Sequence, residues 1–267
     1  MSISDAAKSI SSRDNPTLKR LRLLAESAVA RRQHGATILE GIHLAQVWLA
    51  RCGPPNLALF AESALGKPET AALWQQLNPA VRIVTADHLF KSLSQLETGQ
   101  GVLFEVSLPI IELPAKLEQS CVILDGVQDP GNVGSILRSA AAAGIGWILT
   151  TRGTAQCWAP KVLRAAMGAH TALQIMEGLT PEDFLPCLAV PIIATSSHAE
   201  QSIYQLNLNS SVAWAMGNEG AGVSAALQAQ VTHWAGIPQP GGEESLNVAA
   251  AAAVCLFEQV RQQLQVG

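Results

Sequence analysis

The sequence has few charged residues and no long apolar run. Charged residues make up 14% of the 267 residues and hydrophobic residues 48%, which excludes an intrinsically disordered protein. The longest apolar run, Val248 to Phe257, is far shorter than the roughly 18–20 residues of a membrane-spanning helix, so no membrane partner is expected. Asp5 and Lys8 precede any apolar run, so we expect no secretory signal and a soluble, cytoplasmic protein.

The sequence also lacks the motifs of metal and nucleotide sites. Its five cysteines are odd in number and scattered, and neither CxxC nor HxxxH occurs. We therefore expect no disulfide framework and no metal. The absence of GxGxxG and of GxxxxGK followed by Ser or Thr excludes the usual dinucleotide fingerprint and a Walker loop.

Charge is distributed unevenly along the chain. Residues 1–108 hold eleven Lys and Arg against nine Asp and Glu, whereas residues 109–267 hold six against twelve. A polyanionic partner is thus expected to contact mainly the N-terminal part. On charge alone, an equally good interpretation is that Lys19, Arg20 and Arg22 form the solvated face of a helix.

Hydrophobic periodicity predicts an α/β fold in two domains, divided by a proline-containing linker at 109–118. The N-terminal domain, 1–108, is expected to contain a helix after Asn15-Pro16 with apolar positions through Ala28, helices at 42–50 and 68–77, and strands at 37–40, 57–60, 81–84 and 101–106. The C-terminal domain, 119–267, is expected to contain helices at 135–143 and 246–264 and strands at 121–124, 147–150, 172–176, 192–195 and 212–216.

Three glycine-containing turns are the candidate functional segments. In the first, a buried strand ends at Leu124 and a Gly-, Asp- and Asn-rich loop leads into a helix, where free backbone N–H groups can bind a ligand. Asn132 offers a carboxamide near this turn, and Arg138, four residues after Gly134, is expected to project beside the loop. An ordinary strand-to-helix connection, with both side chains incidental, is the alternative.

The second and third turns follow later strands. The three glycines Gly217, Gly220 and Gly222 allow close backbone approach to a ligand, and Glu219 between the first two is not a typical core residue. The alternative is a flexible surface loop. In the third turn, 237–248, Ser245 or Asn247 starts the last helix, and plain helix capping is the more probable interpretation of that turn alone.

The order of the three turns is more specific than any one of them. Asn-x-Gly-x-x-x-Arg at 132–138, Gly-Asn-Glu-Gly-x-Gly-x-Ser at 217–224 and Ile-Pro-x-x-Gly-x-x-Glu-Ser-Leu-Asn-Val at 237–248 resemble the three motifs of the SpoU (TrmH-type) RNA ribose 2′-O-methyltransferases of the SPOUT superfamily. The resemblance spans residues 121–264, including the segment 160–168. Residues 12–106 are similar to that family's L30e-like substrate-binding domain.

This resemblance implies a homodimer that binds S-adenosylmethionine at a C-terminal trefoil knot and methylates a ribose 2′-hydroxyl, in rRNA rather than tRNA. It implies that Arg138 deprotonates the hydroxyl or stabilises its oxyanion, and that Asn132, Glu219, Ser245 and Asn247 orient Arg138 and the ribose. The implied cofactor-binding residues are Thr195, Gly217, Asn218, Gly222, Ile237 and Leu246. RNA is expected to contact Arg13, Lys19, Arg20 and Arg22.

Two positions depart from the family pattern. Gln239 stands where Met is more frequent, and Ala166 where Ser is frequent, which leaves the substrate preference open. Two other functions are alternatives. A non-catalytic RNA-binding or ribosome-assembly factor is disfavoured because the five candidate catalytic residues are all present, and a Rossmann-type dehydrogenase because the strand–GxGxxG–helix unit is missing.

Overall fold

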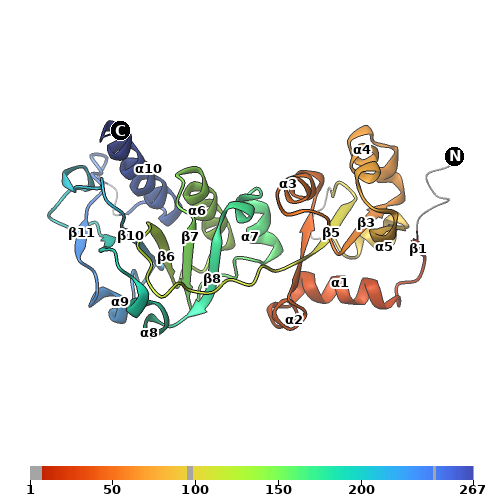
Figure 1. Cartoon of the computed structure of the whole chain (residues 1–267), viewed down its shortest axis with the longest axis horizontal. Helices are drawn as coiled ribbons and strands as arrows, with labels where there is room; N and C mark the ends of the chain where they lie inside the picture. The colour runs from red at the N-terminus through yellow and green to blue at the C-terminus, as the bar shows by residue number, and fades with distance from the viewer. Residues whose placement is uncertain (1–7, 95–98, 243–244, 267) are drawn as a thin grey trace. The chain divides into compact units, whose positions relative to one another are not determined.

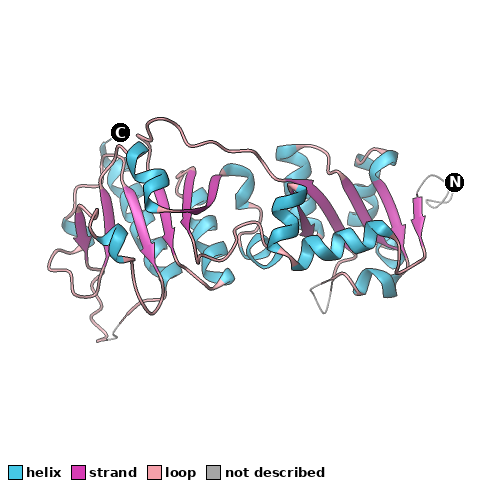
Figure 2. Ribbon diagram, turned by 90° about the horizontal axis from the view of Figure 1, so that it is seen from below, coloured by secondary structure: helices cyan, strands magenta, loops and turns pink. Residues whose placement is uncertain are grey.

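The computed structural model describes residues 8–94, 99–242 and 245–266. Residues 1–7, 95–98, 243–244 and 267 lie outside the described residues, and 243–244 are part of the predicted third turn. The chain forms two compact units, one made of residues 1–109 with 158–171 and the other of residues 110–157 with 172–267. Each unit contains one β-sheet with helices packed against it, so the predicted α/β class is confirmed (Figures 1 and 2).

The first unit contains a mixed five-stranded sheet in the order β1-β4-β3-β5-β2. Its strands are β1 (Lys8–Ile10), β2 (Ala36–Glu40), β3 (Leu57–Ala61), β4 (Arg82–Thr85) and β5 (Val102–Ser107). The helices are α1 (Pro16–Glu26), α2 (Ala28–His34), α3 (Ile42–Cys52), α4 (Pro68–Gln76), α5 (Asp87–Lys91) and α7 (Pro160–Ala165). Leu18, Leu21 and Leu24 recur at helical spacing on α1 and are fully buried in the core of this unit.

The second unit contains a six-stranded parallel sheet in the order β11-β9-β10-β6-β7-β8. Its strands are β6 (Cys121–Asp125), β7 (Trp147–Thr151), β8 (Gln174–Leu179), β9 (Ile192–Thr195), β10 (Ala213–Gly217) and β11 (His233–Ala235). The helices are α6 (Pro130–Ala142), α8 (Pro181–Phe184), α9 (Ala225–Gln228) and α10 (Val248–Val266). The apolar strand β6 is buried along its whole length, as expected for a strand covered on both faces.

Most predicted elements are present, and the differences lie at their ends. The helix predicted from Ser135 begins at Pro130, because Asp129 caps it by accepting a hydrogen bond from Asn132 N at 2.7 Å. The helix predicted through Ala28 ends at Glu26, and Ser27 caps a new helix. The strand predicted at 172–176 runs instead from Gln174 to Leu179. Strands β1 and β11 were not predicted, since each has only three residues.

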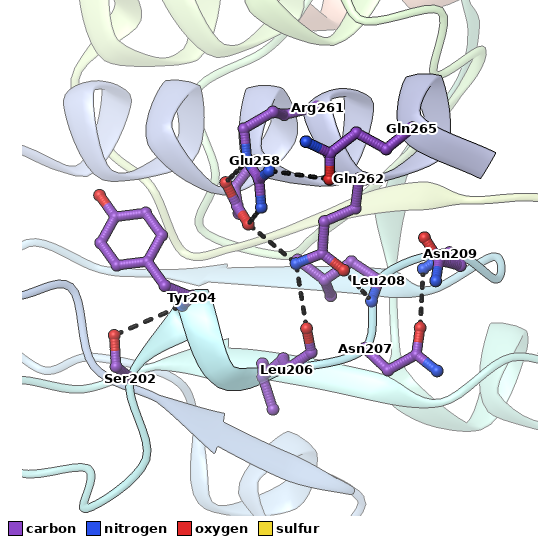
Figure 3. A network of polar contacts seen from close by, with 10 residues as sticks. All are labelled: Ser202, Tyr204, Leu206, Asn207, Leu208, Asn209, Glu258, Arg261, Gln262 and Gln265. Atoms are coloured by element: carbon purple, nitrogen blue, oxygen red, sulfur yellow. Dashed lines mark hydrogen bonds and ion pairs between the residues drawn. The ribbon is translucent and has the colours of Figure 1, made fainter. Parts of the chain in front are cut away.

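Helix α10 fixes the connection between β9 and β10 through side-chain hydrogen bonds (Figure 3). The Gln262 amide donates to the carbonyl of Leu206 at 3.0 Å and accepts from the N–H of Leu208 at 2.8 Å. Glu258 accepts from Gln262 at 2.8 Å and from both Nε and Nη2 of Arg261 at 2.7 Å. Helices α10 and α6 lie side by side (Figure 1), so this scaffold also supports the first predicted turn.

Candidate active site

The predicted turns converge at the carboxyl ends of neighbouring parallel strands. β9 ends at Thr195, β10 at Gly217 and β6 at Asp125, while Ile237 follows the end of β11 by two residues. These four strands are adjacent in the sheet. In parallel α/β sheets, ligands bind outside this edge, because loops and helix N-termini gather there.

The loop after β10 is tightly folded around Asn218. The backbone N–H and C=O of Asn218 pair with Gly222 at 2.9 Å in both directions. The side-chain oxygen of Asn218 accepts from the N–H groups of Gly220 and Ala221. Its amide nitrogen donates to the carbonyl of Gly126, in the first turn, at 2.9 Å. A Cβ atom on Gly217 would overlap the backbone of Gly222, so the loop's own packing requires glycine there. This loop is therefore held by hydrogen bonds rather than flexible.

Three predicted catalytic residues form one hydrogen-bonded chain. The Asn132 amide donates to Glu219 Oε1 at 2.8 Å, and its oxygen accepts from Asn247 Nδ2 at 2.9 Å. Asn247 also caps α10, since its oxygen accepts from Ala249 N at 2.9 Å. One residue from each turn thus takes part, although 87 and 115 residues separate Asn132 from its two partners.

A cavity of about 360 Å³ lies between the second and third turns. Its described lining combines apolar side chains, among them Val223 and Val248, with hydroxyl groups and the carboxylate of Glu219. It includes every residue predicted to bind the cofactor, namely Thr195, Gly217, Asn218, Gly222, Ile237 and Leu246. Ser245 and Asn247 line it as well. Its volume lies in the range usual for small-molecule sites.

Arg138 is not brought to this cavity. Arg138 was expected about one turn into its helix, but α6 begins at Pro130, so Arg138 lies about two turns into it. Arg138 follows Asn132 by six positions, which corresponds to about 9 Å along the axis and places the two side chains on different faces of the helix. Arg138 is exposed and does not line the cavity.

Asp125 is a site residue that the sequence analysis missed. This buried carboxylate accepts from Thr151 Oγ1 at 2.7 Å and from the N–H of Ser224, at the end of the glycine loop, at 2.6 Å. It thereby joins β6 and β7 to that loop. An acidic residue at the end of the apolar strand 121–125 was the signal available in the sequence.

The four basic residues predicted to contact RNA differ in their surroundings. Arg13 is exposed, Lys19 pairs with the exposed Asp14 at 2.9 Å, and Arg22 donates a hydrogen bond to Ser92 Oγ at 3.2 Å. Arg20 pairs at 2.7 Å with Glu105, whose side chain is only 3% exposed. Burial raises the pKa of Glu105, while Arg20 lowers it. Arg20 therefore compensates the negative charge of the buried Glu105 carboxylate.

The second unit contains three buried cysteines, Cys121, Cys157 and Cys255, whose thiols are unlike free surface thiols. Burial raises the pKa of Cys121 and of Cys255 to about 12 and that of Cys157 well above its ordinary value. These raised pKa values favour the protonated thiols at neutral pH, and the thiolate is the form that reacts as a nucleophile. Within the described ranges, no three His, Cys, Asp or Glu side chains form a group suited to a metal ion. Nor is any helix there long and apolar enough to cross a bilayer.

Comparison with known proteins identifies consistent relatives. The SpoU rRNA Methylase family pattern matches residues 119–257. An uncharacterized tRNA/rRNA methyltransferase of Synechocystis is 34% identical over 96% of this chain and 94% of its own. RlmP of Bacillus subtilis, a 23S rRNA (guanosine-2′-O)-methyltransferase, is 30% identical over 82% of this chain and 86% of its own. The structure of an AdoMet-bound rRNA methyltransferase from Sinorhizobium meliloti matches 96% of this chain and 98% of its own, with a TM-score of 0.81 and 26% identity.

Proposed function

The chain belongs to the SpoU rRNA methylase family, and on that premise we propose that it transfers the methyl group of S-adenosylmethionine to a ribose 2′-hydroxyl of RNA. The observation that carries this proposal is the cavity at the carboxyl ends of β9, β10 and β11, with the chain Glu219–Asn132–Asn247 at its border. The Sinorhizobium relative is described as bound to the same methyl donor.

The residues present fit S-adenosylmethionine. Ile237 and Leu246 offer apolar walls for the flat adenine, the backbone of the loop at Gly217 offers polar groups to the ribose, and Glu219 suits an ammonium group. When bound, the cofactor supplies a methyl group on a positively charged sulfur. The task of the chain's own residues is positioning, because methyl transfer is an in-line displacement.

Arg138 is proposed to act on the ribose oxygen. A guanidinium has a pKa above about 12 and is a poor base, so its contribution is to stabilise the negative charge that develops on the hydroxyl oxygen. Asn132, Glu219, Ser245 and Asn247 are proposed to hold the ribose and this arginine in place. The hydrogen bonds among Asn132, Glu219 and Asn247 support that role, because they fix three side chains before any ligand arrives.

We propose a homodimer in which Arg138 serves the cavity of the partner subunit. The place of Arg138 on an exposed part of α6, away from the cavity of its own chain, supports this arrangement. Helix α10, which packs on α6, exposes an apolar stripe at intervals of seven residues: Ala250, Phe257 and Leu264, of which the last two are 48% and 77% exposed. A second copy would remove this stripe from water.

Mixed dimers test the shared site. One chain carries Arg138→Ala, and the other carries Ala251→Phe, which fills part of the cavity from α10. Each homodimer is expected to be inactive, whereas the mixed dimer is expected to recover activity, since one of its two sites receives neither change. A mixed dimer that forms but stays inactive would show that each subunit builds its own site. Phe257→Glu is expected to yield a monomer in sedimentation.

We propose rRNA as the substrate and tRNA as the alternative. The Bacillus relative's name specifies 23S rRNA, which supports the first, while the Synechocystis relative's name covers both classes. The trefoil knot, the L30e-like character of residues 1–108 and the cytoplasmic location stay predictions. The domain limits at 108 and 119 also stay predictions.

A labelled-methyl assay tests the proposed activity. The purified protein is incubated with methyl-labelled donor and either rRNA or tRNA from cells lacking this gene. Label is expected in rRNA, within dinucleotides that resist alkali, because a methylated 2′-oxygen cannot attack the neighbouring phosphate. Label in tRNA alone would reject the rRNA assignment. RNA binding without transfer to either would favour the non-catalytic RNA-binding factor.

A further inference from the structure

Gln239 carries a buried polar atom without a partner. Among the described residues, its side-chain Oε1 is shielded from solvent and accepts no hydrogen bond. Buried acceptors are nearly always paired, because leaving one unpaired costs the hydration that it lost on folding. An unpaired acceptor in a folded protein therefore points to a donor that is supplied from outside the chain.

The position of Gln239 indicates where that donor comes from. Gln239 lines the 360 Å³ cavity together with Ile237, two residues earlier in the third turn, and Leu246, later in the same turn. These apolar side chains suit a flat aromatic ring rather than a charged group. Among the described residues that line the cavity, the carboxylate of Glu219 comes from the second turn and suits the cationic end of a ligand.

We propose that Gln239 Oε1 accepts a hydrogen bond from the exocyclic 6-amino group of the methyl donor's adenine, and so selects adenine over purines that lack this donor. This inference rests on the proposed function, since it assigns a part of the same ligand. An adenine lying against Ile237 and Leu246 presents its amino group at the edge of the ring, within the plane. A side-chain oxygen that the fold has already desolvated is suited to recognise it, because a ligand without the donor leaves the oxygen unpaired.

A thermodynamic cycle tests the proposal. Calorimetry measures the Kd of the wild-type protein and of Gln239→Met for S-adenosylhomocysteine and for its analogue with hydrogen in place of the 6-amino group. Met has a similar length and no strong acceptor. We expect Gln239→Met to weaken S-adenosylhomocysteine binding about tenfold, in line with the loss of one hydrogen bond, and to change analogue binding by less than about twofold. Gln230→Met, at an exposed glutamine outside the cavity, is the matched control and is expected to change neither.

Thermal melting of the ligand-free protein provides an independent readout. Replacing an unpaired buried acceptor by an apolar group is expected to leave the Tm unchanged or to raise it, whereas a merely structural glutamine would lower the Tm when replaced. Equal weakening of both ligands, no weakening of either, or a lower Tm of the ligand-free variant would overturn the proposal. Failure of the wild-type protein to bind S-adenosylhomocysteine would instead overturn the proposed function.

Discussion

The role proposed for Arg138 is limited to the transition state of methyl transfer. It lies outside the cavity of its own chain, so replacing it is expected to leave donor affinity nearly intact. An interaction made mainly in the transition state appears in turnover rather than in binding.

We therefore expect Arg138→Ala to lower kcat by about a hundredfold or more, the usual scale for losing one donor to a developing oxyanion. The Kd of the methyl donor, measured by calorimetry, should change little. Arg138→Lys is expected to recover only a small part of the rate, because an ammonium lacks the planar array of donors. A large loss of donor affinity in either variant would contradict this role.

Asp125 acts through the loop that it holds. Its two carboxylate oxygens accept from Thr151 and from the N–H of Ser224, and both bonds are buried or partly buried. An amide in its place offers one acceptor. If that oxygen still accepts from the Ser224 N–H, the NH2 group faces the Thr151 hydroxyl, which already accepts from the Gly126 N–H and loses the acceptor of its own hydrogen.

Asp125→Asn is thus expected to cost about 1–3 kcal/mol of folding free energy, the range for an unsatisfied buried group. Because the glycine loop lines the cavity, the Kd for S-adenosylhomocysteine should rise as well. Denaturant unfolding and calorimetry measure the two effects. Asp129→Asn serves as a control, since an asparagine can still cap α6 and Asp129 does not line the cavity. Unchanged ligand affinity in Asp125→Asn would show that the loop does not depend on this anchor.

At the scale of elements, α10 combines three tasks. Its N-terminus begins beside the cavity, one side packs on α6, and its last turns hold the connection 206–208 (Figure 3). Hydrogen bonding from Arg261 lowers the pKa of the buried Glu258 carboxyl below its ordinary value. The charged form of Glu258 is thus favoured in the folded protein.

This shift predicts a pH-dependent contribution to stability. A lowered folded-state pKa stabilises the fold at pH values above the unfolded pKa, about 4.3, and the benefit is lost as pH falls through the folded value. The wild-type protein is therefore expected to be more stable than Glu258→Gln at pH 7, by an amount that shrinks toward zero as the pH falls below about 4. Denaturant unfolding at a series of pH values measures this difference. Glu200→Gln, at an exposed site, should show none of it. A difference that does not vary with pH would refute the electrostatic account.

At the scale of the whole molecule, charge divides the two parts of the sequence. The N-terminal 108 residues carry a small positive balance and the rest a negative one, so RNA affinity is proposed to reside mainly in the N-terminal part. The ion pair of Arg20 with buried Glu105 changes how this is tested. Neutralising Arg20 would leave a buried carboxylate without its cation, and loss of folding would then be mistaken for a direct effect on RNA binding.

The sharper variant therefore neutralises Arg13, Lys19 and Arg22 and keeps Arg20. It is expected to weaken RNA binding and to reduce the slope of log affinity against log salt by up to about three, roughly one for each phosphate that the protein no longer neutralises. Binding titrations at several salt concentrations measure both. Neutralising Lys116 and Arg152, which are exposed residues of the second unit, is the control. An unchanged slope in the first variant would remove these residues from the RNA-contacting surface.

The sequence by itself determined the elements whose signals are local. The strand predicted at 192–195 has the same limits in the structure, and Leu18, Leu21 and Leu24 lie in the core as their helical spacing indicates. The capping of the last helix by Asn247 follows from its residue type and position. The start of α6 was misjudged because Gly131 and Gly134 lower helix propensity, whereas the Asp129 cap and Pro130 outweigh that cost.

Only the tertiary structure decided how distant residues meet. The pairing of Asn132 with Glu219 and Asn247 depends on β6, β10, β9 and β11 lying side by side, an order that no local pattern contains. The same holds for the Arg20–Glu105 pair, formed across 85 residues of the chain. The unpaired oxygen of Gln239 likewise depends on packing. The sequence shows that Gln239 departs from the family pattern, but only the folded third turn buries its oxygen without a partner among the described residues. Side-chain pairings of this kind are set by strand order and packing, which are non-local, and so they follow from the fold rather than from the spacing of residues.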